Sequence, residues 1–145
     1  MQCPLRSYLR NRFNLEIGYM EKLMQGGVSL NTRCPAGNTP VLEAVYTKPT
    51  AVSIQFIQMG KKYGMDLNFF NDSGISPLLK AVMMGNAQLV EALVGVESLK
   101  VDMLNMFRLS ALYYAVSGVN GGAIVRLLLK AGADPNIQVS PWWGC

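Results

Sequence analysis

An internal repeat constrains this chain more than any other feature of its sequence. Four short stretches align, GVSLN, GMDLN, SLKVD and GADPN, and their last residues stand at positions 31, 68, 102 and 136. Successive endings are therefore 37, 34 and 34 residues apart. Such a period indicates a solenoid, in which each repeat buries its apolar face against its neighbours.

A second motif keeps a fixed distance from the first. Thr39, Ser76 and Ser110 each stand eight residues after one of the first three endings, within NTPVLEAV, ISPLLKAV and LSALYYAV. Their hydroxyl groups can accept hydrogen bonds from the unpaired amides at a helix start, and Pro40 and Pro77 suit the first helical position. Each block is therefore predicted to begin a helix.

A turn and a second helix should follow each of these short helices. The turns are marked by Pro49, by Gly85-Asn86 and by the glycines between 118 and 122. Longer apolar runs come after them and predict buried helices. These runs lie at residues 52–57, 89–94 and 124–129.

The ends of the second helices carry a further expectation. Gly64 and Gly132 can close two of them in the left-handed conformation, which glycine adopts without a steric penalty. Ser98 stands at the matching place in the other repeat. We expect about 1 kcal/mol of backbone strain there, so that Ser98→Gly stabilises the fold.

Helix, turn, helix and an eight-residue connector together resemble the ankyrin repeat family, whose unit of about 33 residues opens on T-P-L-H-x-A. The resemblance covers residues 15 to 138. It implies an all-α fold, a solenoid of about four stacked helix-turn-helix units with hairpin-like connectors. Leu42, Leu79 and Tyr113 replace the family's histidine. Packing must therefore supply the bracing that this histidine gives.

The register divides residues 1–145 as one ankyrin repeat domain. Its parts are a degenerate N-terminal capping repeat (1–31), three repeats (32–68, 69–102 and 103–136) and a C-terminal segment (137–145). That segment is either a tail or the start of a truncated repeat. In the first case Trp142 and Trp143 fold back as a lid over the apolar last helix, and in the second the array continues.

Composition argues against several classes of function. The chain has no histidine and three cysteines without C-x-x-C spacing, so we expect no metal site. No nucleophile or phosphate-binding motif appears, which argues against an enzyme and against a cofactor. A net charge of +4 is scattered in small groups, so nucleic acid is not an expected partner. The sequon at Asn71-Asp72-Ser73 is interpreted as chance.

Membrane and compartment follow from the same composition. No apolar run reaches the roughly 18 residues that span a bilayer, so we expect no membrane partner. The odd number of cysteines favours a reducing compartment. The chain is predicted to reside in the cytoplasm or the nucleus.

The ankyrin resemblance implies a protein-binding module that uses its concave face and connector tips as an adaptor, scaffold or inhibitor. The alternative is a structural fragment of a longer array, for example the substrate-receptor part of a ubiquitin ligase adaptor. We expect a monomer unless the C-terminal face is uncapped. Exposed apolar side chains on first helices and connectors mark the expected partner site. They are Tyr46, Phe69, Phe70, Met83, Met84, Met106, Phe107, Arg108 and Tyr114.

Overall fold

The computed structural model describes residues 17–136 of the 145-residue chain. Expectations about residues 1–16 and about Trp142 and Trp143 lie outside the described residues. Within the described part the secondary structure is helical, with seven α-helices and no strand. Two compact units, Met1–Pro77 and Leu78–Cys145, divide the chain, and we call them the N-terminal and C-terminal units.

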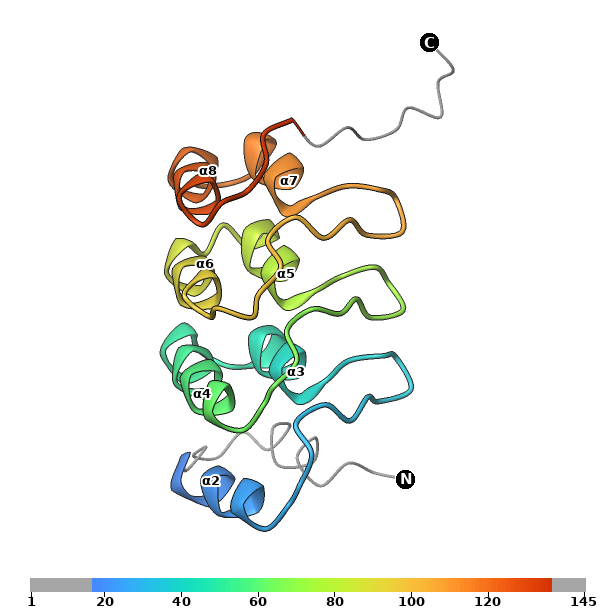
Figure 1. Cartoon of the computed structure of the whole chain (residues 1–145), viewed down its shortest axis with the longest axis vertical. Helices are drawn as coiled ribbons and strands as arrows, with labels where there is room; N and C mark the ends of the chain where they lie inside the picture. The colour runs from blue at the N-terminus through green and yellow to red at the C-terminus, as the bar shows by residue number, and fades with distance from the viewer. Residues whose placement is uncertain (1–16, 137–145) are drawn as a thin grey trace. The chain divides into compact units, whose positions relative to one another are not determined.

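The N-terminal unit contains α2 (Ile17–Gln25), α3 (Pro40–Thr47) and α4 (Thr50–Lys62). Helices α3 and α4 pair through a short turn, and α2 lies against α4 (Figure 1). Their core is apolar and nearly sealed from solvent. It includes Val41, Leu42, Val45, Phe56 and Ile57. Ser53 is also buried, and its hydroxyl donates to the Ala44 carbonyl at 3.1 Å, which satisfies the group.

The C-terminal unit contains two helix pairs, α5 (Pro77–Met83) with α6 (Ala87–Val94) and α7 (Ala111–Ser117) with α8 (Gly121–Lys130). The second pair stacks on the first, and α6 packs against α8 (Figure 1). Leu89, Val90 and Leu93 of α6 and Ile124 and Leu128 of α8 are buried. The second helix of each repeat is longer than the first, as predicted.

The helix starts predicted from the sequence are confirmed. Pro40 and Pro77 are the first residues of α3 and α5, where a missing amide costs nothing. The Ser110 hydroxyl accepts a hydrogen bond from the Tyr113 amide at 3.3 Å and caps α7. The Thr39 hydroxyl differs, because it is buried and has no hydrogen-bond partner among the described residues.

Three hairpin-like connectors, which we call fingers, precede the first helices at residues 34–38, 71–75 and 105–109. In each finger the amide of the first residue donates to the carbonyl four residues later, at 2.9 to 3.1 Å. The residue before the last has a positive φ: Gly37 (78°), Gly74 (74°) and Arg108 (60°). The predicted hairpin form is confirmed, and the third finger uses a non-glycine residue where the others use glycine.

Asn71 organises the second finger. It is also the residue that a glycan would modify if the Asn71-Asp72-Ser73 sequon were used. Its side chain is buried, and its Oδ1 accepts from the amides of Ser73 and Ile75 at 3.0 and 2.9 Å. Its Nδ2 donates to Asn38 of the first finger at 2.8 Å. A glycan on this nitrogen would break that bond and require the side chain to leave its site, so the fold disfavours modification there.

The expectation of strain at Ser98 is wrong. Gly64 and Gly132 do have positive φ, but Ser98 is not among the positive-φ residues of the described chain. Helix α6 already ends at Val94, and the turn after it is closed by a bond from the Leu99 amide to the Val96 carbonyl. The chain between Val94 and Leu99 therefore changes direction without a left-handed residue.

Candidate functional site

The predicted partner-binding residues have different surroundings in the structure. Among the apolar ones Met106 and Phe107 are the most exposed, at 60% and 63% of their surface. Met83, Met84 and Tyr46 are also exposed, as is Arg108, whereas Phe70 and Tyr114 are half-buried. Phe69 is only 3% exposed. These side chains therefore do not form one uniformly accessible strip.

Phe69 belongs to the interior of the N-terminal unit. The Arg33 guanidinium lies 5.2 Å from the centre of its ring, a cation–π contact that covers the ring further. A buried ring held in this way contributes to the fold and offers a partner little surface. The sequence could not distinguish Phe69 from Phe70, because a connector lacks the periodicity that assigns faces in a helix or strand.

The tip of the third finger brings Met106, Phe107 and Arg108 together. Asn105, buried beneath them, accepts at its Oδ1 from the amides of Phe107 and Leu109 at 3.0 and 3.1 Å. These two bonds fix the backbone of the tip. Its apolar side chains are thus presented by an ordered turn, which lowers the entropy cost of binding.

Tyr114 connects this tip to helix α7. The Asn105 Nδ2 donates to the Tyr114 hydroxyl at 3.2 Å, so the finger and the helix are joined through side chains. The Tyr113 ring lies edge-on to that of Tyr114, with 5.9 Å between their centres and an interplanar angle of 85°. Tyr114 therefore acts as a support of the tip. We call Met106, Phe107, Arg108 and Tyr114 the finger cluster.

Met83 and Met84 lie at the other end of a first helix. They stand at and just after the C-terminus of α5, whereas the second finger joins the N-terminus of α5 at Pro77. The seven residues of α5 separate the two ends by roughly 10 Å. These methionines thus form a second exposed apolar site, distinct from the tip of a finger.

Further exposed apolar side chains, which the sequence did not single out, lie on α7 and α8 and in the turn between them. They are Tyr113 and Val116 of α7, Leu129 of α8 and Val119 of the turn between these helices. Tyr113 was expected to pack between repeats, because it stands at the same place in its repeat as Leu79. One sequence signal could have predicted their exposure. They lie in the last of the matching repeats, and no described repeat follows to cover them.

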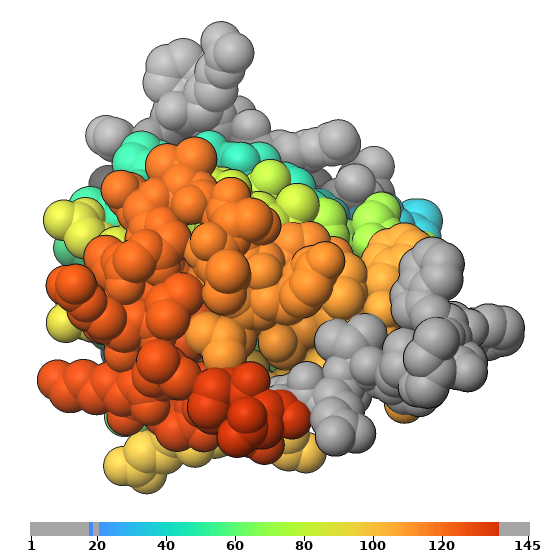
Figure 2. Space-filling view, turned by 90° about the horizontal axis from the view of Figure 1, so that it is seen from above, coloured from blue at the N-terminus to red at the C-terminus, as the bar shows by residue number. Residues whose placement is uncertain are grey.

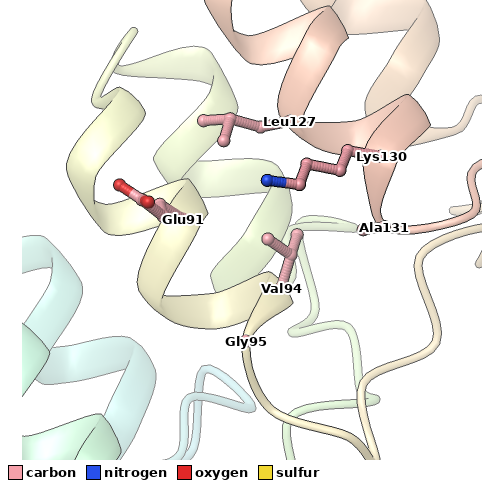
Figure 3. Close-up of a pocket in the computed structure, with 6 residues that line it drawn as sticks. All are labelled: Glu91, Val94, Gly95, Leu127, Lys130 and Ala131. Atoms are coloured by element: carbon pink, nitrogen blue, oxygen red, sulfur yellow. The ribbon is translucent and has the colours of Figure 1, made fainter.

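A shallow groove lies between α6 and α8, with a volume of about 270 Å³. Val94 and Leu127 face each other across it, and the Lys130 side chain extends between them towards the α6 side, where Glu91 stands (Figure 3). Gly95 and Ala131 complete the lining. Its two ionisable side chains are Glu91 and Lys130, and the rest of its lining is apolar or glycine.

Residues 17–136 also bear on the expectations about metal and membrane binding. No cluster of three or more histidine, cysteine or acidic residues there could hold a metal ion. In the same range no helix has the length and apolar character required to cross a bilayer.

Comparison with known proteins places this geometry in a wider context. The family model described as ankyrin repeats (3 copies) matches residues 50–139. An ankyrin repeat domain from Acinetobacter baumannii AYE is similar in structure, with a TM-score of 0.67 and 28% identity over 81% of this chain. The chain spans 59% of the length of that domain.

A second solved structure, the ankyrin repeat protein EF0377, has a TM-score of 0.74 and 26% identity over 93% of this chain. The alignment covers 67% of that protein. A search of curated proteins finds no match.

Proposed function

The chain belongs to the ankyrin repeat family, and from this membership we propose that it binds a partner protein through the finger cluster of its C-terminal unit. Ankyrin repeats are generally protein-interaction modules, and the all-α repeat architecture predicted from the sequence is confirmed. The role of this chain as an adaptor, scaffold or inhibitor is part of the proposal.

The exposed tip of the third finger is the observation that carries this proposal. The first two fingers have small or polar tips, Pro35-Ala36-Gly37 and Asp72-Ser73-Gly74, whereas the third has Met106-Phe107-Arg108. Two large apolar side chains exposed by more than half of their surface are costly in water. A partner that buries them would recover that cost.

The backbone of the tip supports the same interpretation. Arg108 has a φ of 60°, although the matching residues of the other fingers are glycines. A side chain in that conformation costs about 1–2 kcal/mol, and strained residues of this kind cluster at binding sites. An arginine at this strained position would be accounted for by a contact between its guanidinium and an acidic group of the partner.

A second candidate function is that of a structural part of a longer ankyrin array, for example the substrate-receptor part of a ubiquitin ligase adaptor. The observation in its favour is that this chain spans 59% and 67% of the two solved relatives. In that case the finger cluster would be one portion of a longer contact surface, and effector functions would lie in other segments.

A capture experiment with matched variants tests the finger cluster. Immobilised wild type should retain a discrete partner from cell extract, and Met106→Ser with Phe107→Ser should lose it. Met83→Ser with Met84→Ser removes comparable exposed surface at the far end of α5 and should keep the partner. Far-UV circular dichroism of all three proteins should agree.

The two double variants also define the contrary outcomes. Equal loss of the partner in both would locate the contact along the first helices instead of the finger tip. If the Met106→Ser and Phe107→Ser variant retained the partner fully, the finger cluster would not be part of the binding site. Phe70→Ala is not a suitable probe, because Phe70 is half-buried and its loss would perturb packing.

A further inference from the structure

We infer that the finger cluster recognises an acidic, apolar segment of a partner protein, with a carboxylate on the Arg108 guanidinium and apolar side chains packed on Met106 and Phe107. This recognition depends on the proposed function, which it narrows to one chemical class of partner. It also sets the direction of selectivity, because the same arginine would repel a basic segment.

Charge is unevenly distributed in the C-terminal unit. From Met103 to Val125, a stretch that contains the third finger and α7, Arg108 is the only charged residue. The first helix of the repeat before it, α5, contains Lys80 and no acid. The third finger and the two first helices of this unit therefore carry positive charge only, which attracts an acidic segment.

The acids of the same unit lie on other elements. They are Glu91 on α6 and Glu97, Asp102 and Asp134 in the segments that follow α6 and α8. Among residues 17–136, no acid forms an ion pair with Arg108, which is exposed. The guanidinium is therefore open to a carboxylate of another molecule, with which it can make two parallel hydrogen bonds.

The tip holds Arg108 beside its apolar neighbours in a fixed geometry. The Arg108 amide donates to the Asn105 carbonyl at 2.9 Å, and Met106 and Phe107 directly precede the arginine. An ion pair at a bare surface contributes little, because water and salt screen it. A partner that covers the two apolar side chains also shields the arginine, so the charge contact becomes stronger.

The surface beside the tip continues along α7. Tyr114 of this helix is joined to the finger through Asn105. Atoms of α7 and of the residues before it lie at the surface, in orange, in the space-filling view (Figure 2). Helix α7 has no charged residue, so a partner segment can extend along it while Arg108 alone selects for charge.

The N-terminal unit lacks this combination. The tip of its second finger includes Asp72, which is exposed, and Glu43 lies on α3. Its Arg33 stands over the ring of Phe69. An acidic segment would meet like charges there, so the third finger is the one suited to it.

A peptide carboxylate suits the third finger better than a nucleic acid backbone. Duplex DNA carries a charge about every 1.7 Å, and its binding relies on several cations along the backbone. Arg108 and the half-buried Lys80 are the only cations on the third finger and the two first helices of this unit.

Selection of displayed peptides tests the inference with a defined probe. A library of random peptides is selected on the immobilised full chain and, separately, on the Met106→Ser and Phe107→Ser double variant. We expect the peptides enriched only on the wild type to combine Asp or Glu with large apolar residues. The enriched peptide, synthesised with a fluorescent label, then gives dissociation constants by anisotropy.

Charge variants show whether the acid of the peptide contacts Arg108. Arg108→Glu should weaken binding about tenfold or more, and a peptide whose acid is replaced by lysine should regain affinity for this variant. Arg126→Glu makes the same change of net charge on α8, which lies beyond α7 from the finger (Figure 1). It should change the affinity less than about twofold, since salt screens the charge. Circular dichroism of both variants should match the wild type.

Two outcomes of the selection separate this inference from the proposed function. Peptides that need Met106 and Phe107 but contain no acid would refute the acidic partner and leave the finger cluster as a binding site. Peptides that bind the double variant as well as the wild type would refute both.

The remaining contrary results concern the charge and the kind of ligand. Equal loss of affinity in Arg108→Glu and Arg126→Glu would show an effect of net charge without a contact to Arg108. Enrichment of no peptide would refute recognition of a linear segment. A generic DNA duplex that displaces the peptide at low salt and not at high salt would assign Arg108 to nucleic acid.

Discussion

The buried hydroxyl of Thr39 offers the sharpest test of how this chain departs from its family. Thr39 precedes α3 and is 2% exposed, yet its Oγ1 has no hydrogen-bond partner among the described residues. The neighbouring position 42, where the ankyrin motif has histidine, is the fully buried Leu42. Leucine has no polar side-chain atom, so position 42 offers this hydroxyl none of the hydrogen-bonding groups that a histidine would carry.

Thr39→Val replaces the hydroxyl by a methyl group of nearly equal size. A buried unpaired polar group costs about 1–3 kcal/mol, and the substitution leaves no cavity. No helix cap is lost, because the Thr39 side chain makes no capping bond. We therefore expect the free energy of unfolding to rise by about 1–2 kcal/mol, or roughly 3–6 °C in melting temperature.

Urea denaturation followed by far-UV circular dichroism measures this change. The midpoint should rise with an unchanged slope. Ser110→Ala is the matched control at the same place in the repeat, where the hydroxyl does cap its helix, and it should cost about 1 kcal/mol. If Thr39→Val is destabilising to a similar extent, the Thr39 hydroxyl caps α3 in solution and the reasoning is refuted.

Four further changes test other parts of the structure. Arg108→Gly relieves the positive φ and should raise the unfolding free energy by about 0.5–1 kcal/mol in urea melts; a decrease would show that the arginine side chain supports its finger. Asn71→Ala leaves two finger amides without their acceptor and should cost about 2 kcal/mol, with faster hydrogen exchange of those amides. In α8, Gly121→Ala directs a Cβ into the Ala115 carbonyl and should lower the melting temperature. Gly122→Ala meets nothing within 4 Å and should add about 0.5 kcal/mol, so equal effects of these two would contradict the packing described.

Local signals in the sequence predicted the helices well. Helix starts at Pro40 and Pro77 and helix ends near Gly64 and Gly132 all depend on residues within one turn of the chain. The expectation at Ser98 failed because it relied on repeat spacing alone. Helix α6 ends early, at Val94, so Ser98 does not stand directly after a helix end. No residue near Ser98 indicated this early end.

The candidate site was harder to predict than the helices. Phe69 and Phe70 are adjacent aromatic residues in a connector, and only packing showed that Phe69 is interior and Phe70 half-buried. The support of the third finger by Tyr114 depends on a side-chain bond from Asn105, nine residues earlier. Bonds of this kind leave no periodic trace in a sequence.

The sequence by itself determined the repeat length, the register and the order of helices, because these follow from local backbone preferences and from the spacing of apolar residues. It could not determine which apolar positions are covered. Val82 and Val116 have the same place in consecutive repeats, and one is buried while the other is exposed. Burial depends on a neighbouring element, so only the tertiary structure reveals the exposed apolar side chains of α7 and the exposed finger tip.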